Sequence, residues 1–389
     1  MSRKLDDWAE SFIKYTNNTE PRKVYRRWVA LSTIASALKR KVKLTWGSEI
    51  FFANMFIVLV GPPASRKGTA MRPGKEFITR AGIAISADET SKQRLVKAMQ
   101  DTAAQIGQDS RGRPIVHCSL TIHATELTVF LGFDSRDMLS MLQKFYDSEE
   151  RYIKETISRG TEEISNVWCN LLGATTPGQL QVAMPIEAIS YGFASRTVFV
   201  FEEDKERAVI KPTLDEELGD KLMQDFEEIL HMHGEFTTTP AYDDLYTSWR
   251  MNAESTVIFR EPHLEYYVQR RPTHLFKLSL LYSAARTSDM ILTDVDLQKA
   301  IDTLHEVEIK MPRVFSGIGL NPLAGVQQRV RNAIERQGTI TIAELLEEFT
   351  SDLDLEQMTS VLKSLEAMKV CKQDLRNSKI IAVKKAGTH

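Results

Sequence analysis

The segment FIVLVGPPASRKGT, from Phe56 to Thr69, holds the strongest chemical signal in the sequence. Its apolar run ends at Gly61, a Gly-Pro-Pro turn follows, and Lys67 comes six residues after the glycine. Small residues in such a turn let backbone N–H groups converge on an anion, and the next helix adds its positive N-terminal dipole. The lysine then reaches the terminal phosphates, so the segment predicts a phosphate-binding loop. A coincidental turn beside a lysine is the alternative.

The loop departs from the pattern G-x-x-x-x-G-K-[ST] at two positions. Arg66 stands where the second glycine is expected, and Gly68 stands where the hydroxyl that binds Mg²⁺ is expected. Thr69 supplies a hydroxyl one residue later, and we assign it to the metal. The cofactors predicted here are ATP and Mg²⁺. The residues assigned to nucleotide binding are Gly61, Pro62, Pro63, Ala64, Ser65, Arg66, Lys67, Gly68 and Thr69.

Two later apolar runs end in polar residues that fit the same reaction. SLTIHATEL ends in Thr125 and Glu126, where an acidic pair is expected. Glu126 would orient the attacking water, and Thr125 would contact the metal weakly or through water. NLLGATTP ends in Thr175 and Thr176, and we assign Thr176 to the γ-phosphate or the attacking water. The alternatives are an exposed glutamate at a strand end and turn residues before Pro177.

Arg196 comes directly before a further apolar run, TVFVF. An arginine in that place would stabilise the charge that develops on the nucleotide of a neighbouring subunit. We therefore predict that Arg196 is catalytic between subunits. A surface salt bridge is the competing interpretation.

The order of the elements predicts how these residues are held. Apolar, strand-like runs alternate with helical stretches from about residue 50 to residue 203, which is typical of an α/β fold with a parallel sheet. The sequence after Pro212 favours helices, and SGIGLNPLAG has the composition of a linker. The predicted parts are a helical N-terminal segment (1–48), an ATPase core (49–212), a helical lid (213–315), a linker (316–325) and a winged helix (326–389).

Charge is unevenly distributed along a nearly neutral chain. Residues 1 to 45 carry a net charge of +7, and residues 202 to 235 carry −8. A positive block attracts polyanions, so we predict that the N-terminal segment contacts nucleic acid; a solvated surface helix is the alternative. The tail from Pro322 is nearly balanced, which leaves room for a protein partner. The residues assigned to nucleic acid are Arg26, Arg27, Arg40 and Lys41.

Several runs together resemble a known family: KVYRRWVALSTIASALKRKV, GPPASRKGTA, HATEL, LLGATTPGQL, YGFASR and RRPTHLFKLSLLYSAA. They are similar to the phage and mobile-element P-loop proteins found with primases and helicases, which are described as AAA+ or superfamily 3-like DNA helicase ATPases. Arg196 matches the family's G-F-x-x-R motif, and Arg271 with Lys277 matches its R-x-x-H-x-x-K-L segment. Ala64 and Gly68 depart from the family's loop.

The resemblance implies a P-loop core of the AAA+ or RecA-like type and binding of the nucleotide by Arg271. It also implies a homo-oligomeric ring, such as a hexamer, that acts on single-stranded DNA during bacteriophage replication, with primase or another replication protein as partner. A helicase loader or recombination factor is the alternative within this class. A non-catalytic DNA-binding scaffold with a degenerate loop is the alternative outside it.

Other features narrow the class of protein. The sequence has no apolar run long enough for a membrane span and no apolar segment at its N-terminus, so we expect a cytoplasmic protein. Three cysteines without a C-x-x-C pair argue against a disulfide framework and a cysteine zinc site.

Overall fold

The protein divides into two compact units, Met1–Phe315 and Ser316–His389. The computed structural model describes residues 3–108, 112, 114–132, 135–156, 160–183, 192–254, 259, 264–315, 324–350, 352–374 and 379–382. The segments predicted as N-terminal part, core and lid all belong to the first unit. Most of the predicted linker lies outside the described residues.

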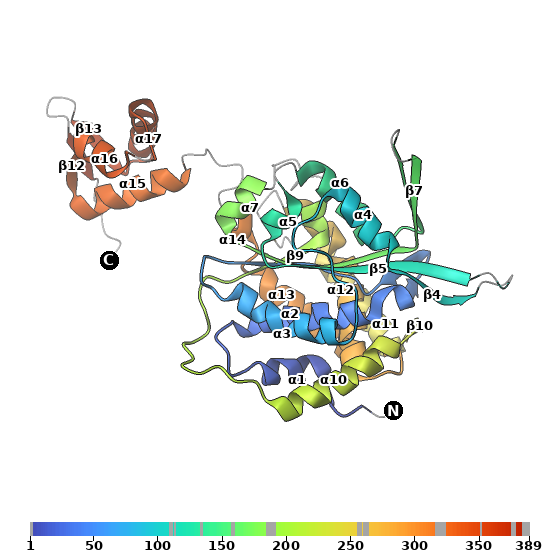
Figure 1. The fold of residues 1–389 in the computed structure, drawn as a ribbon. Helices are drawn as coiled ribbons and strands as arrows, with labels where there is room; N and C mark the ends of the chain where they lie inside the picture. Colours follow the sequence, from blue (N-terminus) through green and yellow to red (C-terminus); the bar gives the residue numbers. More distant parts are fainter. Residues whose placement is uncertain are drawn as a thin grey trace. The chain divides into compact units, whose positions relative to one another are not determined.

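A five-stranded sheet forms the centre of the first unit, with the strand order β4-β5-β8-β3-β9 (Figure 1). Four of these strands run parallel, and β4 is antiparallel to β5. Each residue of β3 and β8 is buried, which explains their uninterrupted apolar sequences, because helices cover both faces of the sheet. The strands are β3 (Phe56–Val60), β4 (Ala103–Gln108), β5 (Pro114–Ala124), β8 (Val167–Thr175) and β9 (Thr197–Phe201).

The register of the sheet brings three strand ends to one edge. Val60 of β3 pairs with Thr175 of β8, and Ala124 of β5 pairs with Gly173 of β8. Parallel strands end on the same side of a sheet, so the loops that follow β3, β5 and β8 are neighbours. β9 begins at the opposite edge, where Thr197 pairs with Phe56.

Helices lie on both faces of this sheet (Figure 1). On one face α2 packs against β3, β8 and β9, while α5 and α6 pack against β8 from the other. Two aromatic side chains of α2, Tyr25 and Trp28, are fully buried. The helices of the α2 side are α1 (Trp8–Tyr15), α2 (Lys23–Leu38), α3 (Lys67–Arg80) and α10 (Glu216–His231). Those of the other side are α4 (Lys92–Gln100), α5 (Leu127–Leu131), α6 (Ser135–Tyr146) and α7 (Pro177–Ala183).

The region predicted as a helical lid contributes strands to a second sheet. Its strand order is β11-β10-β1-β2. Within it β1, near residue 45, pairs in parallel with β10, near residue 235. The predicted lid is therefore tied to the N-terminal part of the chain. The strands are β1 (Val42–Trp46), β2 (Glu49–Phe52), β10 (Gly234–Thr238) and β11 (Ile291–Leu292).

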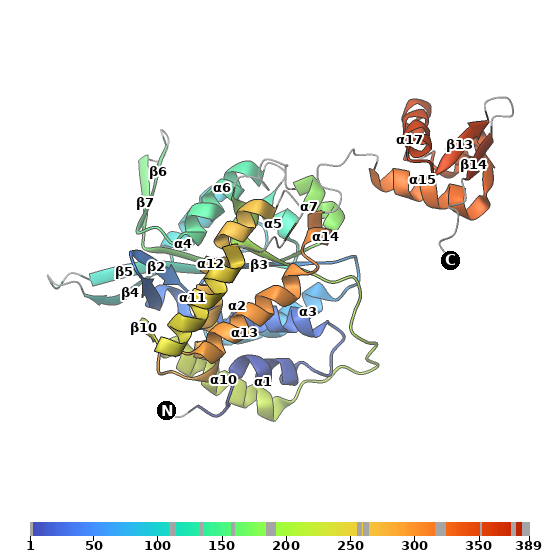
Figure 2. The ribbon, with the colours of Figure 1, turned by 180° about the vertical axis from the view of Figure 1, so that it is seen from behind.

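The remaining helices of the first unit, apart from α9, lie after Pro212 and agree with the prediction that this part of the sequence favours helices. α12 and α13 lie side by side (Figure 2). Among the described helices, none is both long enough and apolar enough to cross a membrane. These helices are α9 (Phe193–Arg196), α11 (Pro240–Glu254), α12 (Glu265–Arg286), α13 (Asp294–Glu308) and α14 (Pro312–Phe315).

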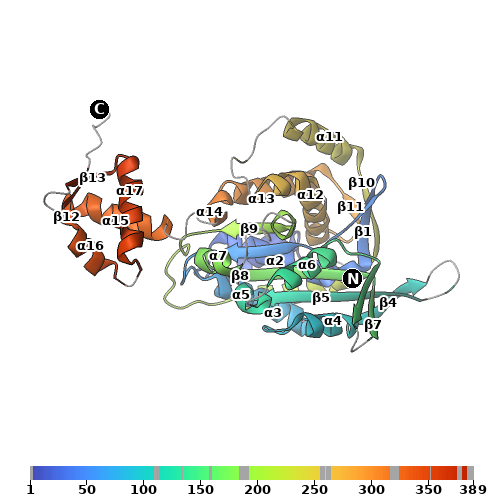
Figure 3. The ribbon, with the colours of Figure 1, turned by 90° about the horizontal axis from the view of Figure 1, so that it is seen from above.

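Two hairpins project beyond the helices of the first unit, as the view from above shows (Figure 3). One is the pair β4 and β5, and the other joins β6 (Arg151–Thr156) to β7 (Gly160–Ser165). The second hairpin stands in the chain between β5 and β8, the strands that carry the predicted acid and the predicted threonine.

The second unit has its own core of buried side chains, including Val330, Leu345 and Leu362. Its three strands form an antiparallel sheet with the order β12-β14-β13. The elements, in chain order, are α15 (Ala324–Gln337), β12 (Thr339–Thr341), α16 (Ile342–Glu348), α17 (Leu355–Ala367), β13 (Cys371–Asp374) and β14 (Lys379–Ala382).

Candidate functional site

Gly61 stands where β3 leaves the sheet, and the space around it excludes any side chain. A Cβ atom there would lie 2.3 Å from the carbonyl oxygen of Glu202 and 2.6 Å from the hydroxyl of Tyr25. That hydroxyl donates to the carbonyl of Val60 at 2.7 Å. The glycine is therefore required by close packing at the end of the strand.

The loop after Gly61 turns through two left-handed residues. Ala64 has a φ of 67° and Arg66 a φ of 66°, a backbone region that costs a residue with a side chain roughly 1 to 2 kcal/mol. Backbone N–H groups in turns of this kind form concave sites for anions. Arg66 thus adopts the conformation for which the loop pattern expects glycine, and its Nε lies 2.5 Å from a carboxylate oxygen of Glu20.

Lys67 is the first residue of α3 and folds back onto the loop. Its ammonium donates to the carbonyl oxygens of Gly61 at 2.8 Å and Pro62 at 2.9 Å, and to the hydroxyl of Ser65 at 3.1 Å. Burial lowers the pKa of Lys67, and the negative charge of Glu126 opposes that shift. The predicted lysine and the predicted acid therefore interact electrostatically, although they are far apart in the sequence.

A hollow of about 440 Å³ joins the loop to the ends of β5 and β8. It is lined by the three predicted polar residues at strand ends, Thr125, Glu126 and Thr176, together with the loop that contains Lys67. The structure thus brings these residues together at one edge of the sheet. The lining residues are Pro63, Ala64, Arg66, Lys67, Gly68, Thr69, Thr125, Glu126, Thr175, Thr176 and Gln179.

Gln179 also lines the hollow, although no motif of the sequence singled it out. Its side-chain oxygen accepts hydrogen bonds from the backbone N–H of Thr176 at 3.3 Å and from the Thr176 hydroxyl at 3.1 Å. The hydroxyl accepts in turn from the backbone N–H of Gln179 at 3.2 Å. This is the reciprocal cap of a helix start, here α7, and the T-x-x-Q spacing is the signal that could have found it. Thr176 therefore has a structural role as a cap.

The hollow offers few ligands for the expected Mg²⁺. Gly68 has no side chain, and among the described residues no atom outside its own turn of helix lies within 4 Å of the place where its Cβ would be. The remaining candidates are the hydroxyls of Thr69 and Thr125 and one carboxylate, that of Glu126. No cluster of three or more His, Cys, Asp or Glu suited to a metal occurs among the described residues. Magnesium in phosphate-binding loops is held by the Ser or Thr that follows the lysine, by one or two carboxylates and by phosphate oxygens. With Gly68 after the lysine and one carboxylate, this hollow provides fewer protein ligands than that arrangement, so it does not fit a tightly held ion.

Arg196 lies away from this hollow, at the edge of the sheet where β9 begins. It forms an ion pair with Asp147, with Nη2 2.5 Å from Oδ2, and its side chain is 13% exposed. Arg270 contacts the same carboxylate at 3.2 Å. The described structure thus corresponds to the competing interpretation of Arg196 as part of a salt bridge, and it shows no contact between Arg196 and the loop of its own chain.

The residues that matched the family's R-x-x-H-x-x-K-L segment are buried within α12. Arg271 pairs with Glu308 through two contacts, at 2.7 and 3.0 Å. Lys277 donates to the carbonyl of Phe52 at 3.0 Å and to Asn54 at 2.6 Å. Arg271 lines a different hollow, between α11 and α12, and is not brought to the loop that contains Lys67.

The four residues assigned to nucleic acid are not presented together on the surface. Arg26 is 2% exposed and donates to the carbonyl of Ile13, and Arg40 is 7% exposed and donates to the carbonyls of Ser148 and Val167. A side chain in that position cannot reach a DNA phosphate, so this assignment is corrected for Arg26 and Arg40. The other two residues are also engaged: Arg27 pairs with Glu306, and Lys41 donates to the carbonyl of Leu230.

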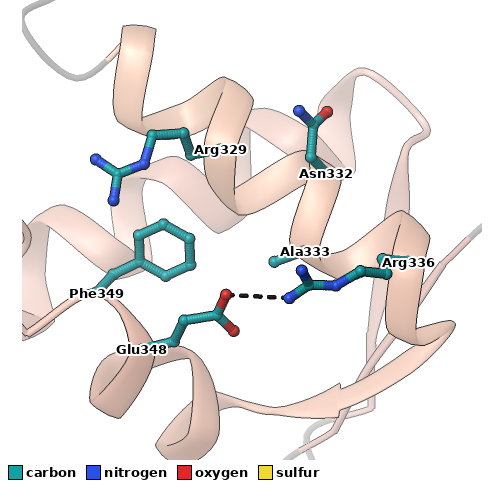
Figure 4. Close-up of a pocket in the computed structure, with 6 residues that line it drawn as sticks. All are labelled: Arg329, Asn332, Ala333, Arg336, Glu348 and Phe349. Carbon is teal, nitrogen blue, oxygen red and sulfur yellow. Dashed lines mark hydrogen bonds and ion pairs between the residues drawn. The ribbon is translucent and has the colours of Figure 1, made fainter.

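A smaller hollow of about 280 Å³ lies in the second unit, between α15 and α16 (Figure 4). Arg336 pairs with Glu348 across it at 3.2 Å, and Arg329 lies over the ring of Phe349 and pairs with Asp352. The charges of both arginines are balanced within the unit, so these contacts stabilise the packing of its helices.

No family model matches the chain, and the search of curated proteins finds no match.

Proposed function

We propose that the first unit binds ATP in the hollow between the loop of Lys67 and the ends of β5 and β8, and that it hydrolyses it. The observation that carries this proposal is the convergence of Lys67, Glu126 and Thr176 from three parallel strand ends on one hollow. Ligands of open α/β sheets bind at the carboxyl ends of the strands. A phosphate chain there would meet a lysine, converging N–H groups and the N-terminus of α3.

Each residue has a separate task in this proposal. The backbone N–H groups of Ala64, Arg66 and Lys67 cradle the phosphates, while that of Ser65 donates to the carbonyl of Pro62. The ammonium of Lys67 moves from the carbonyls of Gly61 and Pro62 to the terminal phosphates. Glu126 orients a water molecule and accepts its proton. The water oxygen bonds to the γ-phosphorus, the bond to the bridging oxygen breaks, and ADP and phosphate leave.

Coupling of this reaction to DNA is the part of the proposal that rests on the resemblance. The order of elements in the second unit, helix, strand, two helices and two strands, supports its interpretation as a winged helix. Its helix α17 exposes Lys363 between Glu356 and Glu366. This mixed charge favours a protein partner over the DNA backbone. A homo-oligomeric ring that acts as a helicase on single-stranded DNA remains the proposal within this class, with a helicase loader as its alternative.

ATP turnover with and without single-stranded DNA tests this function. Phosphate release should occur in the parent protein and be lost in Glu126→Gln, and DNA should change the rate if the reaction is coupled to it. Absence of phosphate release under both conditions would contradict hydrolysis.

A nucleotide-binding scaffold without turnover is the second candidate. The absence of side-chain ligands at Gly68 and of an acid at Thr125 favours it. Both candidate functions use the same hollow and differ only in hydrolysis. Binding of ATP without any release of phosphate would therefore select the scaffold.

A further inference from the structure

Two sides of the hollow differ in charge: the side where the sequence predicts Mg²⁺, and the side formed by the loop of Lys67. This difference determines how the charge of a bound phosphate is balanced. This inference rests on the proposed nucleotide site. The side where Mg²⁺ is expected has no side chain at Gly68, the two neutral hydroxyls of Thr69 and Thr125, and a single carboxylate, that of Glu126. The loop side has two adjacent cations, Arg66 and Lys67, where the loop pattern requires only the lysine.

We propose that this site binds the metal-free triphosphate, with Arg66 and Lys67 supplying the positive charge that Mg²⁺ supplies in other phosphate-binding loops. A metal-free triphosphate carries more negative charge than its magnesium complex, so a site for it needs additional cations. Arginine suits this role, because its planar guanidinium is always charged and matches phosphate oxygens in bidentate geometry.

The position of Arg66 is fixed by its surroundings. Its left-handed backbone places it at the start of α3, and its Nε bonds to Glu20. Glu20 is itself held by Lys205 at 2.9 Å and is only 14% exposed, which anchors the contact. The side chain of Arg66 is 43% exposed and lines the hollow. Glu20 therefore holds the arginine at the mouth of the site while leaving it accessible to a ligand.

Glu126 could replace the missing metal ligands only by giving up its proposed role as the base. It is the one carboxylate that lines the described hollow, and its charge already acts on Lys67. A carboxylate bound to a metal is a weaker acceptor for the proton of water. If Arg66 supplies the positive charge in place of the metal, Glu126 remains free to act as the base. No further residue is then needed.

Isothermal titration of ATP into the full-length protein, once in EDTA and once in excess Mg²⁺, tests the inference by binding alone. The affinity of the parent should differ by less than about fivefold between the two conditions. Arg66→Gly removes the guanidinium and suits the left-handed backbone, so it should weaken binding in EDTA by about tenfold or more. Arg80→Ala, at the exposed far end of α3, removes the same charge and should bind like the parent.

Gly68→Ser provides the converse test, because the space beside Gly68 accommodates a side chain. It restores the hydroxyl of the loop pattern, so Mg²⁺ should now tighten binding by about tenfold. The inference is overturned if the parent loses more than about fivefold affinity in EDTA, or if Arg66→Gly binds like the parent there. Absence of ATP binding in both conditions would instead overturn the nucleotide site itself. Circular dichroism establishes that each variant is folded.

Discussion

The ammonium of Lys67 lies 2.8 Å from the carbonyl oxygen of Gly61, so the lysine closes the loop that precedes its own helix. This contact joins the end of β3 to the start of α3. An arriving phosphate would replace the two carbonyl acceptors with stronger, charged ones, because hydrogen bonds between ionised groups are about twice as strong as neutral ones. The loop therefore holds the lysine close to the position in which it would bind a ligand.

The two glycines of the loop should respond differently to the same substitution. Gly61→Ala forces a Cβ against the Glu202 carbonyl, so we expect the free energy of unfolding to fall by about 1 to 3 kcal/mol and ATP binding to be lost. Gly68→Ala meets open space within a helix and should raise that free energy by up to about 1 kcal/mol. Urea unfolding of both variants measures the difference. Equal destabilisation would mean that the loop is packed differently.

Glu126→Gln should separate binding from turnover. The amide preserves the shape of the side chain but does not accept a proton, so the rate of phosphate release should fall by about a hundredfold or more. ATP affinity should stay within about threefold of the parent. Glu89→Gln, on the exposed segment before α4, is the matched control and should hydrolyse ATP like the parent. Unchanged turnover in Glu126→Gln would place the base elsewhere.

Arg196 should behave as a structural residue. Because Asp147 holds it, Arg196→Ala and Asp147→Asn should each lower the free energy of unfolding by about 1 kcal/mol. A mixture of Arg196→Ala and Lys67→Ala proteins should not regain ATP turnover. Recovery of turnover on mixing would show that Arg196 completes a site on a neighbouring subunit, as the sequence predicted.

Stability should fall in mild acid because of a buried histidine. His274 is fully buried between the Tyr146 hydroxyl and the Ser195 carbonyl, and burial lowers its pKa to about 3 from 6.5. The unfolded chain then binds more protons than the folded one between these values, so the stabilisation is present above pH 6.5 and decreases as the pH falls toward 3.

The free energy of unfolding, measured by urea at pH values from 6.5 to 5, checks this prediction. His274→Gln should reduce its dependence on pH by about 1 kcal/mol per pH unit over this range. His233→Gln, at an exposed position after α10, should keep the slope of the parent. If His274→Gln also keeps that slope, the histidine is not held neutral in the folded protein.

Local patterns were sufficient for the strand, the loop and the strand-end residues. The run from Phe56 to Val60 is apolar throughout because β3 is buried on both faces, and the same physics marks β8. Parallel strands align their ends, so Glu126 and Thr176 had to meet the loop once the fold was α/β. Gln179 was missed because its role depends on a helix cap that begins at Thr176.

Long-range contacts account for what the sequence did not predict. β1 pairs in parallel with β10, almost two hundred residues later, and no local pattern encodes such a partner. Arg26 and Arg40 were assigned to nucleic acid because they belong to the positive block of residues 1 to 45, and charged side chains are rarely buried. Their carbonyl partners, Ile13, Ser148 and Val167, come from elements that only the folded chain brings close.

Titration of ATP into the parent protein and Lys67→Ala, followed by calorimetry, tests the central claim most directly. The parent should bind one nucleotide per chain, and Lys67→Ala should bind at least about a hundredfold more weakly, because the phosphates lose their main point charge. Lys75→Ala, on the same helix and paired with Asp88, should bind like the parent. Equal affinity of Lys67→Ala and the parent, or absence of binding by the parent, would contradict the assignment of the hollow as a nucleotide site.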